Sequence, residues 1–510
     1  MNLRSFIAFG ALAAILPVLV NANADDKHLV VVANQEVQSL QAQLTYKEVN
    51  AVGLRNVVEQ LVGLDPEGNL FGMLATSWEQ VDDNTWRFNL REGVLFHDGS
   101  PFNAESAEVS IEWVWSKDNS FTIRELSGPD IDVVPVSDYV IDIVTAEPDP
   151  LLPQRMYLAG IGSAKQITED SIAHDHTPIG TGPYVFDAWN RGLDWTMTSN
   201  PDWWGNSADD AYGKQFFDRV TVQFRAETQV RAAAVQTGEA DIAMFISDSQ
   251  CQQFGEASDL QCLTKASDTY VFFRLDYTGA HPGLADARVR QAVHLAIDNE
   301  GIVTQIMGLG DPLEGQLLPK VAVGSVDVLE DYGYDPERAK NLIEEARADG
   351  VEIPTIHIAA RIGSTPRNDQ IIEAIGFFLN EVGIKTTVAL EEPAIFNEWV
   401  TTRPTEVRAS AWVHPMNNPL MDFALTMKAN YSCVSVVSVY CNEELDAKAA
   451  EASQLVGQER DVALQELVRF AHDEHIVNPI AMVARAYGTP AGLKWEFGID
   501  HRVVAVNMSY

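Results

Sequence analysis

The chain has 510 residues, 46% of them hydrophobic, and its 73 acidic and 35 basic residues give a formal net charge of -38 at pH 7. Such a length is sufficient for two or three domains. The negative charge excludes DNA or RNA as a partner, because their phosphate backbones would be repelled. A charge of this size is also typical of a soluble protein.

Residues 1–24 have the pattern of an export signal. Arg4 supplies the positive charge, an apolar run extends from Phe6 to Val20, and residues 22–24 read A-N-A, a small-residue cleavage site. The run is short for a membrane span, so a membrane anchor is the less favoured alternative. No cysteine lies near the cleavage site to accept a lipid. We therefore expect a cleaved, unanchored protein in a bacterial periplasm.

Residues 74–115 predict a compact β-β-β-α unit. Apolar and polar side chains alternate from Thr85 to Arg91, which indicates a half-buried strand. Asn103 is placed to cap the helix that follows. The three strands are expected at residues 77–81, 85–91 and 94–96.

Further elements follow along the chain. Strands are predicted at residues 29–33, 140–145, 216–224, 353–359 and 384–390, and helices at 227–236, after Asp286, after Asp335 and at 368–382. The last helix lies between two predicted strands, which makes a βαβ unit. Its strands should therefore be parallel, with a right-handed crossover.

Several of these segments also resemble motifs of a known family. Residues 74–115 read LATSWEQVDDNTWRFNLREGVLFHDGSPFNAESAEVSIEWVW, residues 180–184 read GTGPY, residues 236–243 read QTGEADIA, and residues 287–298 read ARVRQAVHLAID. Together they are similar to the extracellular solute-binding proteins of the peptide/nickel class (family 5), the receptors of ABC importers. The resemblance covers nearly the whole chain after the signal.

The resemblance implies a two-lobed α/β clam, the large class II form of the periplasmic-binding-protein fold, with an extra domain inserted in the first lobe. Residues 25–60, 195–276 and 486–510 would form the first lobe, residues 61–194 the inserted domain, and residues 277–485 the second lobe. A solute would lie between the lobes, which close over it. The partners would be a small solute and an ABC permease and ATPase complex at the inner membrane, and the receptor would be a monomer without a cofactor.

Catalytic motifs are not found in the sequence: it contains no G-x-S-x-G, no H-E-x-x-H and no Walker A loop. We therefore expect a receptor and not an enzyme. A secreted hydrolase on the same scaffold and a chaperone-like binder are the alternatives from other functional classes.

Residues 411–423 occupy the place of a family motif of the form GW-x-G-D-x-x-DP-x-x-F. In dipeptide- and oligopeptide-type members the first aspartate of that motif pairs with the ligand's α-ammonium group, through a charge-assisted hydrogen bond. Here that position is Pro415, the second aspartate is Asn418, and Asp422 is near but not aligned. The expected solute is therefore a peptide or peptide-like molecule with a blocked amine, and an opine, a sugar or a metal chelate stays open.

The candidate ligand-binding residues are Trp412, Arg361, His414, Asn417, Asn418 and Gln38. Trp412 offers a flat apolar wall with one N–H donor, although packing in the core is an equal alternative. Arg361 lies one residue from the arginine that binds the ligand carboxylate in dipeptide-type members, and a surface arginine is its alternative. Gln38 lies in the first-lobe loop that often touches ligand in the family.

Four cysteines form two close pairs, Cys251 with Cys262 and Cys433 with Cys441. In an oxidising compartment these two local disulfides are favoured among the three possible connectivities. A zinc site is disfavoured because the spacing is not C-x-x-C and no histidine is close. The histidine groups at residues 174–176 and 472–475 lack further visible ligands, so no metal site is predicted.

Overall fold

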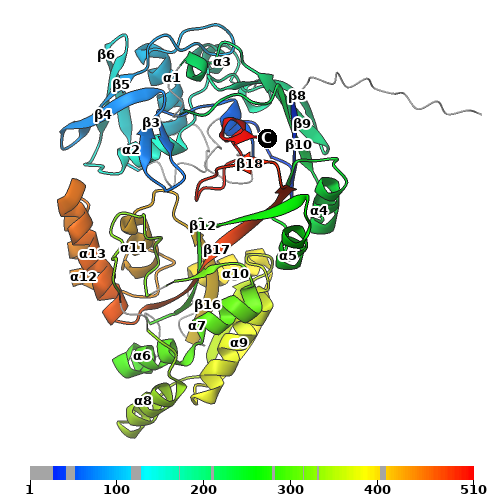
Figure 1. The fold of residues 1–510 in the computed structure, drawn as a ribbon. Helices are drawn as coiled ribbons and strands as arrows, with labels where there is room; N and C mark the ends of the chain where they lie inside the picture. The colour runs from blue at the N-terminus through cyan, green and yellow to red at the C-terminus, as the bar shows by residue number, and fades with distance from the viewer. Residues whose placement is uncertain are drawn as a thin grey trace, which may run out of the picture.

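The computed structural model describes residues 27–41, 52–116, 128–171, 173–207, 212–277, 282–313, 315–329, 332–402 and 409–510. The predicted signal at residues 1–24 lies outside the described residues. The chain forms two lobes, one above the other in Figure 1, with an additional small domain on one side of the upper lobe. The α/β class and the two-lobed arrangement expected from the sequence are confirmed.

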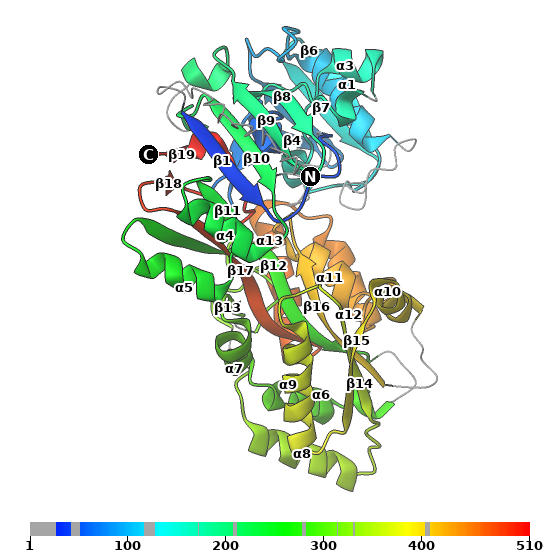
Figure 2. The same cartoon turned by 90° about the vertical axis from the view of Figure 1, so that its right-hand side faces the viewer.

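One mixed sheet of 11 strands extends through both lobes. Its strand order is β15 (Thr386–Glu391), β14 (Ile356–Arg361), β16 (Ala409–Asn417), β12 (Leu260–Leu275), β17 (Val477–Pro490), β11 (Ile242–Met244), β1 (His28–Ala33), β10 (Arg219–Phe224), β9 (Asp194–Ser199) and β8 (Tyr184–Asn190), and β13 (Asp311–Pro312) pairs with β17. The two long central strands, β12 and β17, run from one lobe into the other (Figure 2).

A bulge interrupts the antiparallel pairing of β12 with β17 where these strands pass between the lobes. Ala266 faces Ala484 and Tyr270 faces Met482, so three residues of β12 oppose one residue of β17. Within this bulge the backbone N–H of Asp268 donates to the Ile499 carbonyl (3.2 Å), and its carbonyl accepts from the N–H of Asn418 (3.0 Å). Bulges bend a strand and increase its twist, so the pair of strands changes direction at this point between the lobes.

The second-lobe part of the sheet is covered by helices on both faces. One face packs against α6 (Ala287–Ala296), α8 (Pro336–Ala348) and α9 (Asn368–Glu381). The opposite face packs against α10 (Pro393–Thr402), α11 (Phe423–Tyr431), α12 (Glu443–Ala452) and α13 (Gly457–Asp473), together with the buried part of the segment from Leu313 to Val326. Burial on both faces explains the apolar run YVFF at residues 270–273 of β12, which precedes Arg274.

The predicted βαβ unit is confirmed. Strands β14 and β15 pair in parallel, and α9 connects them. Asp335 caps α8 by accepting from the N–H of Arg338, as its sequence position suggested. Gly350 and Gly383, just beyond α8 and α9, have φ angles of +83° and +90°, conformations that glycine adopts without steric cost.

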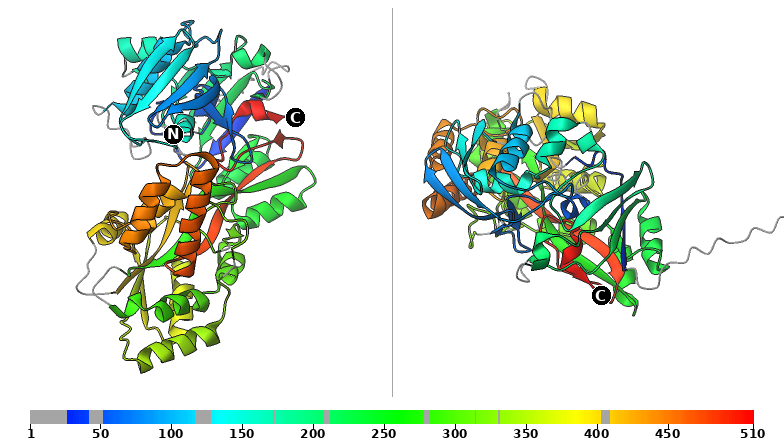
Figure 3. Two further views of the ribbon diagram at one scale, coloured as in Figure 1. Left: turned by 90° about the vertical axis from the view of Figure 1, so that its left-hand side faces the viewer. Right: turned by 90° about the horizontal axis from the view of Figure 1, so that it is seen from above.

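The upper lobe contains the rest of the sheet with α4 (Thr228–Gln236) and α5 (Asp248–Glu256), and a hairpin of β2 (Val62–Leu64) and β3 (Leu70–Gly72). The short strands β18 (Lys494–Trp495) and β19 (Met508–Ser509) bring the C-terminal segment back to this lobe. The small domain contains a four-stranded sheet of β4 (Ala75–Asp82), β5 (Thr85–Leu90), β7 (Val140–Thr145) and β6 (Ile131–Ser137), with α1 (Ala104–Trp115), α2 (Leu152–Leu158) and α3 (Ala164–Glu169), as Figure 3 shows.

One predicted strand of the small domain is wrong. Residues 94–96 form no strand; Leu95 makes a single bridge to Pro101 across a tight turn that includes Gly99 (φ +79°). The N–H of Phe96 donates to the Ser100 carbonyl and the N–H of Phe102 to the Val94 carbonyl (both 2.9 Å), and α1 begins two residues later at Ala104, so the pairing does not extend further. The sheet is completed instead by β6 and β7.

Replacing Asn103 by alanine should destabilise the small domain. The Asn103 side chain accepts from the N–H of Ser106 (3.0 Å), and the Ser106 hydroxyl accepts from the N–H of Asn103 (2.9 Å), a capping box at the start of α1. Loss of such a cap costs about 1 kcal/mol. We expect a lower urea-unfolding midpoint by circular dichroism for Asn103→Ala, while Asn103→Asp retains most of the stability. Equal midpoints for the alanine variant and the unmodified protein would contradict the role of this cap.

Candidate functional site

A groove of about 630 Å³ lies between the two lobes. Its upper wall is formed by the β2–β3 turn at Pro66 and Glu67 and by Ile499, and its floor by β12 and β17 next to the bulge. The lower wall is the segment from Asp311 to Val321 of the second lobe. We call this space the wide groove, and its volume falls in the range of small-molecule sites.

Charged groups of both signs line the wide groove. Glu67 and Asp311 supply carboxylates from opposite lobes, and Lys265 and Lys320 supply ammonium groups. The Lys265 Nζ donates to the carbonyls of Pro66 (2.8 Å) and Phe497 (2.9 Å), so it is anchored to the first lobe. Such a lining can pair with a molecule that carries both a positive and a negative charge.

A second, smaller groove of about 260 Å³ lies on the opposite face of the crossing strands. Val483 lines it and the adjacent Met482 lines the wide groove, because successive side chains of a strand point to opposite faces. Across it, Asp248 at the start of α5 lies 3.6 Å from the Arg367 guanidinium of the second lobe. Gly308 has no side chain where a Cβ atom would clash with the Asp248 carboxylate. This ion pair therefore connects the lobes on the side opposite the wide groove.

Three of the predicted site residues, Trp412, His414 and Arg361, lie together on the face of the sheet that packs under α10. The ring of Trp412 is 3% exposed and contacts the Arg274 guanidinium at 4.8 Å from the ring centroid. The ring of His414 stacks on Phe396, with centroids 6.2 Å apart. Burial, with smaller contributions from Arg274 and Arg361, lowers the pKa of His414 to about 3, so its imidazole is neutral at pH 7.

The other predicted site residues do not join this cluster. Asn417 is exposed at the end of β16, and its amide donates to the Asp268 carboxylate (3.3 Å). Asn418 is fully buried, where its amide donates to the Asp422 carbonyl (2.9 Å). Gln38 is exposed on the first lobe, where its backbone carbonyl accepts from the Arg191 guanidinium at 3.5 Å. None of the six predicted residues lines the wide groove or the smaller groove opposite it.

Asp422 is committed to an internal ion pair. Both guanidinium Nη atoms of Arg460 donate to its carboxylate, Nη2 at 3.0 Å, and both side chains are buried. The same carboxylate accepts from the N–H of Ala424 (2.8 Å) and so caps α11. A carboxylate with these partners is not available to a ligand ammonium group.

Sequence reasoning missed the charged residues of the wide groove. Glu67, Lys265, Asp311 and Lys320 lie in three separate stretches of chain, and each has the character of an ordinary surface charge. The only local signals were the prolines at positions 66, 312 and 319, which indicate fixed loops but no function.

Residues 69–431 match the family model described as bacterial extracellular solute-binding proteins, family 5 Middle. The chain belongs to this family. Proteins of family 5 are receptors of ABC importers, which bind solutes outside the cytoplasm and are not enzymes. Within the described residues, no helix combines the length and the apolar character needed to cross a membrane.

Individual relatives of this family-5 chain are distant in sequence. The glutathione-binding protein GsiB of Pectobacterium atrosepticum is 26% identical over 350 residues, which cover 67% of this chain and 65% of that relative. The structure of HbpA2 from Haemophilus parasuis has a TM-score of 0.82 at 22% identity, covering 94% of this chain and 99% of that chain. The dipeptide-binding protein of Pseudoalteromonas sp. SM9913, solved with Met-Leu, has a TM-score of 0.72 at 20% identity, covering 94% and 99%. These structures share the two-lobed fold.

Both local disulfides are present in this family-5 chain. Cys251 and Cys262 are joined across 11 positions and Cys433 and Cys441 across 8. The rings of His472 and His475 pack around Tyr332 with centroids 4.5 and 5.2 Å from it. In the part of the chain that the structure describes, no group of three or more His, Cys, Asp or Glu side chains is arranged to hold a metal ion.

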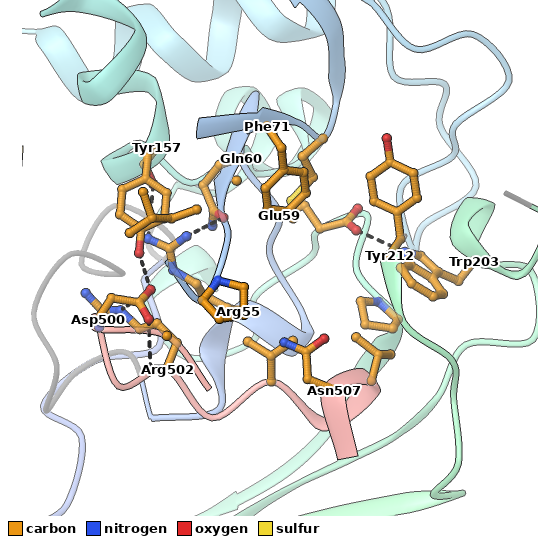
Figure 4. Close-up of a pocket in the computed structure, with 18 of the residues that line it drawn as sticks. Arg55, Glu59, Gln60, Phe71, Tyr157, Trp203, Tyr212, Asp500, Arg502 and Asn507 are labelled. Atoms are coloured by element: carbon orange, nitrogen blue, oxygen red, sulfur yellow. Dashed lines mark hydrogen bonds and ion pairs between the residues drawn. The ribbon is translucent and has the colours of Figure 1, made fainter. Parts of the chain in front are cut away.

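A separate pocket lies inside the upper lobe, between the small domain and the C-terminal segment (Figure 4). We call it the inner pocket; its volume is about 110 Å³. At one end Glu59 is buried, and its carboxylate accepts from the indole N–H groups of Trp203 (2.9 Å) and Trp204 (2.8 Å) and from the Thr181 hydroxyl (2.7 Å). Burial raises the pKa of Glu59 to about 7 although these three hydrogen bonds oppose the shift.

Replacing Arg460 by methionine should destabilise the second lobe strongly. The variant leaves the buried Asp422 carboxylate without its cation, and breaking a buried pair in this way costs about 3–5 kcal/mol. Thermal unfolding should show a markedly lower midpoint for Arg460→Met. Arg338→Met, which removes the exposed pair with Glu345 (3.4 Å), serves as the control and should change the midpoint little. Similar losses for the two variants would contradict the importance of the buried pair.

The raised pKa of Glu59 predicts a pH dependence of stability. Between its unfolded value of 4.5 and its folded value of about 7 the folded protein holds a proton that unfolding releases, so stability falls as the pH rises through this window. The full effect of such a shift is roughly 3 kcal/mol. Urea unfolding at pH 5, 6, 7 and 8 should show this decline in the unmodified protein and a flatter profile in Glu59→Gln. Parallel profiles for the two proteins would contradict the assignment.

Proposed function

We propose that this chain is the periplasmic substrate-binding receptor of an ABC importer, and that it captures a peptide or peptide-like solute in the wide groove. The observation that carries the proposal is the position of this groove: its walls come from both lobes, its floor is the pair of crossing strands, and its lining has charges of both signs. The monomeric receptor would deliver the solute to the permease and ATPase complex. The pattern of residues 1–24 supports export to the periplasm.

Capture would proceed by closure of the lobes. A solute that contacts Glu67 of the first lobe and Lys320 of the second lobe gains both contacts only when the walls are close together. It therefore binds the closed form more tightly and shifts the population toward it. The bulge at residues 267–269 is the flexible point about which the lobes rotate, because the regular strand pairing is interrupted there.

Arg361 lies outside the lining of the wide groove, and it is the proposed partner for a carboxylate at an end of the solute that extends beyond the groove. It ends β14 on the face of the sheet that also packs against the groove segment. Within the described residues its guanidinium makes no hydrogen bond or ion pair, and its two-pronged donor geometry fits a carboxylate. The adjacent Trp412 ring is buried and the His414 ring stacks on Phe396 of α10, so both rings would support Arg361 without contacting the solute.

The solute's amino end is recognised differently from that in dipeptide-type members. Position 415 is a proline, and the Asp422 carboxylate is occupied by Arg460. A free ammonium group would have to pair with Glu67 or Asp311 instead, and a blocked amine needs no such partner. The likeness to a glutathione-binding protein and to a structure holding Met-Leu supports a peptide. The missing carboxylate is what favours the second candidate, a non-peptide solute such as an opine.

Native mass spectrometry of freshly purified protein tests the proposal. We expect a co-purifying mass that fits a small peptide or peptide derivative, and that molecule should raise the melting temperature without being turned over. Glu67→Gln and Lys320→Gln should each weaken its binding roughly 10-fold, because a charge-assisted hydrogen bond is lost. Glu105→Gln, an exposed change on α1 of the small domain, is the matched control. Steady turnover of a peptide or ester library would contradict the receptor function. A co-purifying sugar or opine would contradict the peptide as the solute and support the second candidate.

A further inference from the structure

The inner pocket is separate from the proposed solute site. Its lining includes three stretches of chain from different parts of the sequence: the segment around Arg55 and Glu59 that leads into β2, helix α2 of the small domain, and the C-terminal segment from Gly498 to Asn507. The β2–β3 hairpin, Pro183, Trp203, Trp204 and Tyr212 complete it. The β2–β3 hairpin separates it from the wide groove, and Pro66 lines both spaces. A ligand in the inner pocket would contact all three segments without touching the second lobe.

Arg55 places a positive charge inside this pocket. Its side chain is 8% exposed, and the guanidinium lies over the Tyr157 ring, 4.1 Å from its centroid. Nη1 donates to the Gln60 side-chain carbonyl (2.7 Å) and Nη2 to the Tyr157 carbonyl (3.0 Å), so both partners are neutral. Within the described residues no carboxylate lies within ion-pair distance of this guanidinium. Each Nη atom retains one further N–H, because a guanidinium has five donors.

A second guanidinium, that of Arg502, lines the same end of the pocket (Figure 4). Asp500 is the nearby carboxylate: its Oδ2 lies 3.8 Å from Nε of Arg502 and accepts from the Tyr157 hydroxyl. Within the described residues Asp500 is the carboxylate next to both guanidinium groups, and Arg55 and Arg502 repel each other. Burying the Arg55 charge among neutral partners is costly, so an anion in this end of the pocket would be favourable for Arg55.

The rest of the pocket limits what that anion can be. The Glu59 carboxylate at the other end already accepts from three donors, and the space between is lined by apolar groups such as Leu64, Phe71 and Met73. A volume of about 110 Å³ equals that of three or four water molecules. The pocket therefore suits an anion with a short apolar body.

We propose that the inner pocket is a second ligand site, which binds a short-chain carboxylic acid through Arg55, with its carboxylate between the two guanidinium groups and its hydrocarbon part toward Leu64 and Phe71. The buried Nε of Arg55 has no hydrogen-bond partner within the described residues, and a planar carboxylate can accept from more than one donor of a guanidinium group. The bound acid links the small domain to the C-terminal segment, and so it stabilises the upper lobe independently of the transported solute.

Thermal unfolding of the mature, extensively dialysed protein tests this site, with propionate as the probe and sodium chloride holding the ionic strength constant. Propionate should raise the melting temperature in a saturable way that chloride and phosphate do not reproduce. Arg55→Lys keeps the charge but loses the two-pronged geometry, and it should weaken propionate binding roughly 10-fold. Arg87→Gln, which removes an arginine paired with Asp142 on the surface of the small domain, should leave it unchanged.

A crystal soaked in 3-bromopropionate locates the site directly and does not depend on any variant. The anomalous bromine signal is expected beside Leu64 and Phe71. The proposal is overturned if propionate produces no saturable shift, if phosphate acts equally, if Arg55→Lys binds as tightly as the unmodified protein, or if bromine appears only outside the pocket. Glu67→Gln, which alters only the wide groove, should not change propionate binding. The proposal for the inner pocket and the proposal for the wide groove can therefore be tested independently.

Discussion

The antiparallel pairing of β12 with β17 is the constraint on which the rest of this molecule depends. These two strands are the longest in the described structure, and they carry one sheet through both lobes. On the β17 side they pair with the strands of the upper lobe, and on the β12 side with those of the lower lobe. Each lobe is thereby held by backbone hydrogen bonds to a common ribbon, and the larger of its two register shifts, between Ala266 and Tyr270, lies between the lobes. The wide groove is adjacent to that shift, so a change in the angle between the lobes changes the width of the groove.

The partners of a buried charged group indicate whether that group serves the structure or can bind a ligand, as three groups of this chain illustrate. Asp422 accepts from both Nη atoms of Arg460 and caps a helix, so its carboxylate is not available to a ligand. Glu59 is satisfied by three neutral donors, and the cost of its burial appears as a raised pKa. Among the residues that the structure describes, the hydrogen-bond partners of the Arg55 side chain are neutral, and Arg55 lines a cavity. Burial is unfavourable for each of these charged groups, and the protein offsets it differently in each case. Only the Arg55 guanidinium is placed where a bound anion could offset it.

Much of the fold could be predicted because local sequence signals agreed with the tertiary structure. The period-2 alternation at residues 85–91, the caps at Asn103 and Asp335 and the glycine stops at positions 350 and 383 are all decided within a few residues. The candidate site was harder to predict for a physical reason. Trp412 and His414 carry the family's motif position, but whether a ring faces solvent or core depends on what packs over it, and here α10 covers that face. Asn418 was similarly read as a ligand contact, whereas it is a fully buried support for the start of α11.

The sequence by itself determined the class of the protein, since ordered motifs spread from residue 74 to residue 298 identify a family-5 receptor fold, and it determined that the family's carboxylate is missing at position 415. Only the tertiary structure decided where charges gather. Glu67, Lys265, Asp311 and Lys320 are far apart in the chain, and Arg55 is separated from Arg502 by most of it. Local pattern specifies which face of an element is buried, but the crossing strands and the returning C-terminal segment bring distant faces together. A binding site made of such faces has no signature in any single stretch of sequence.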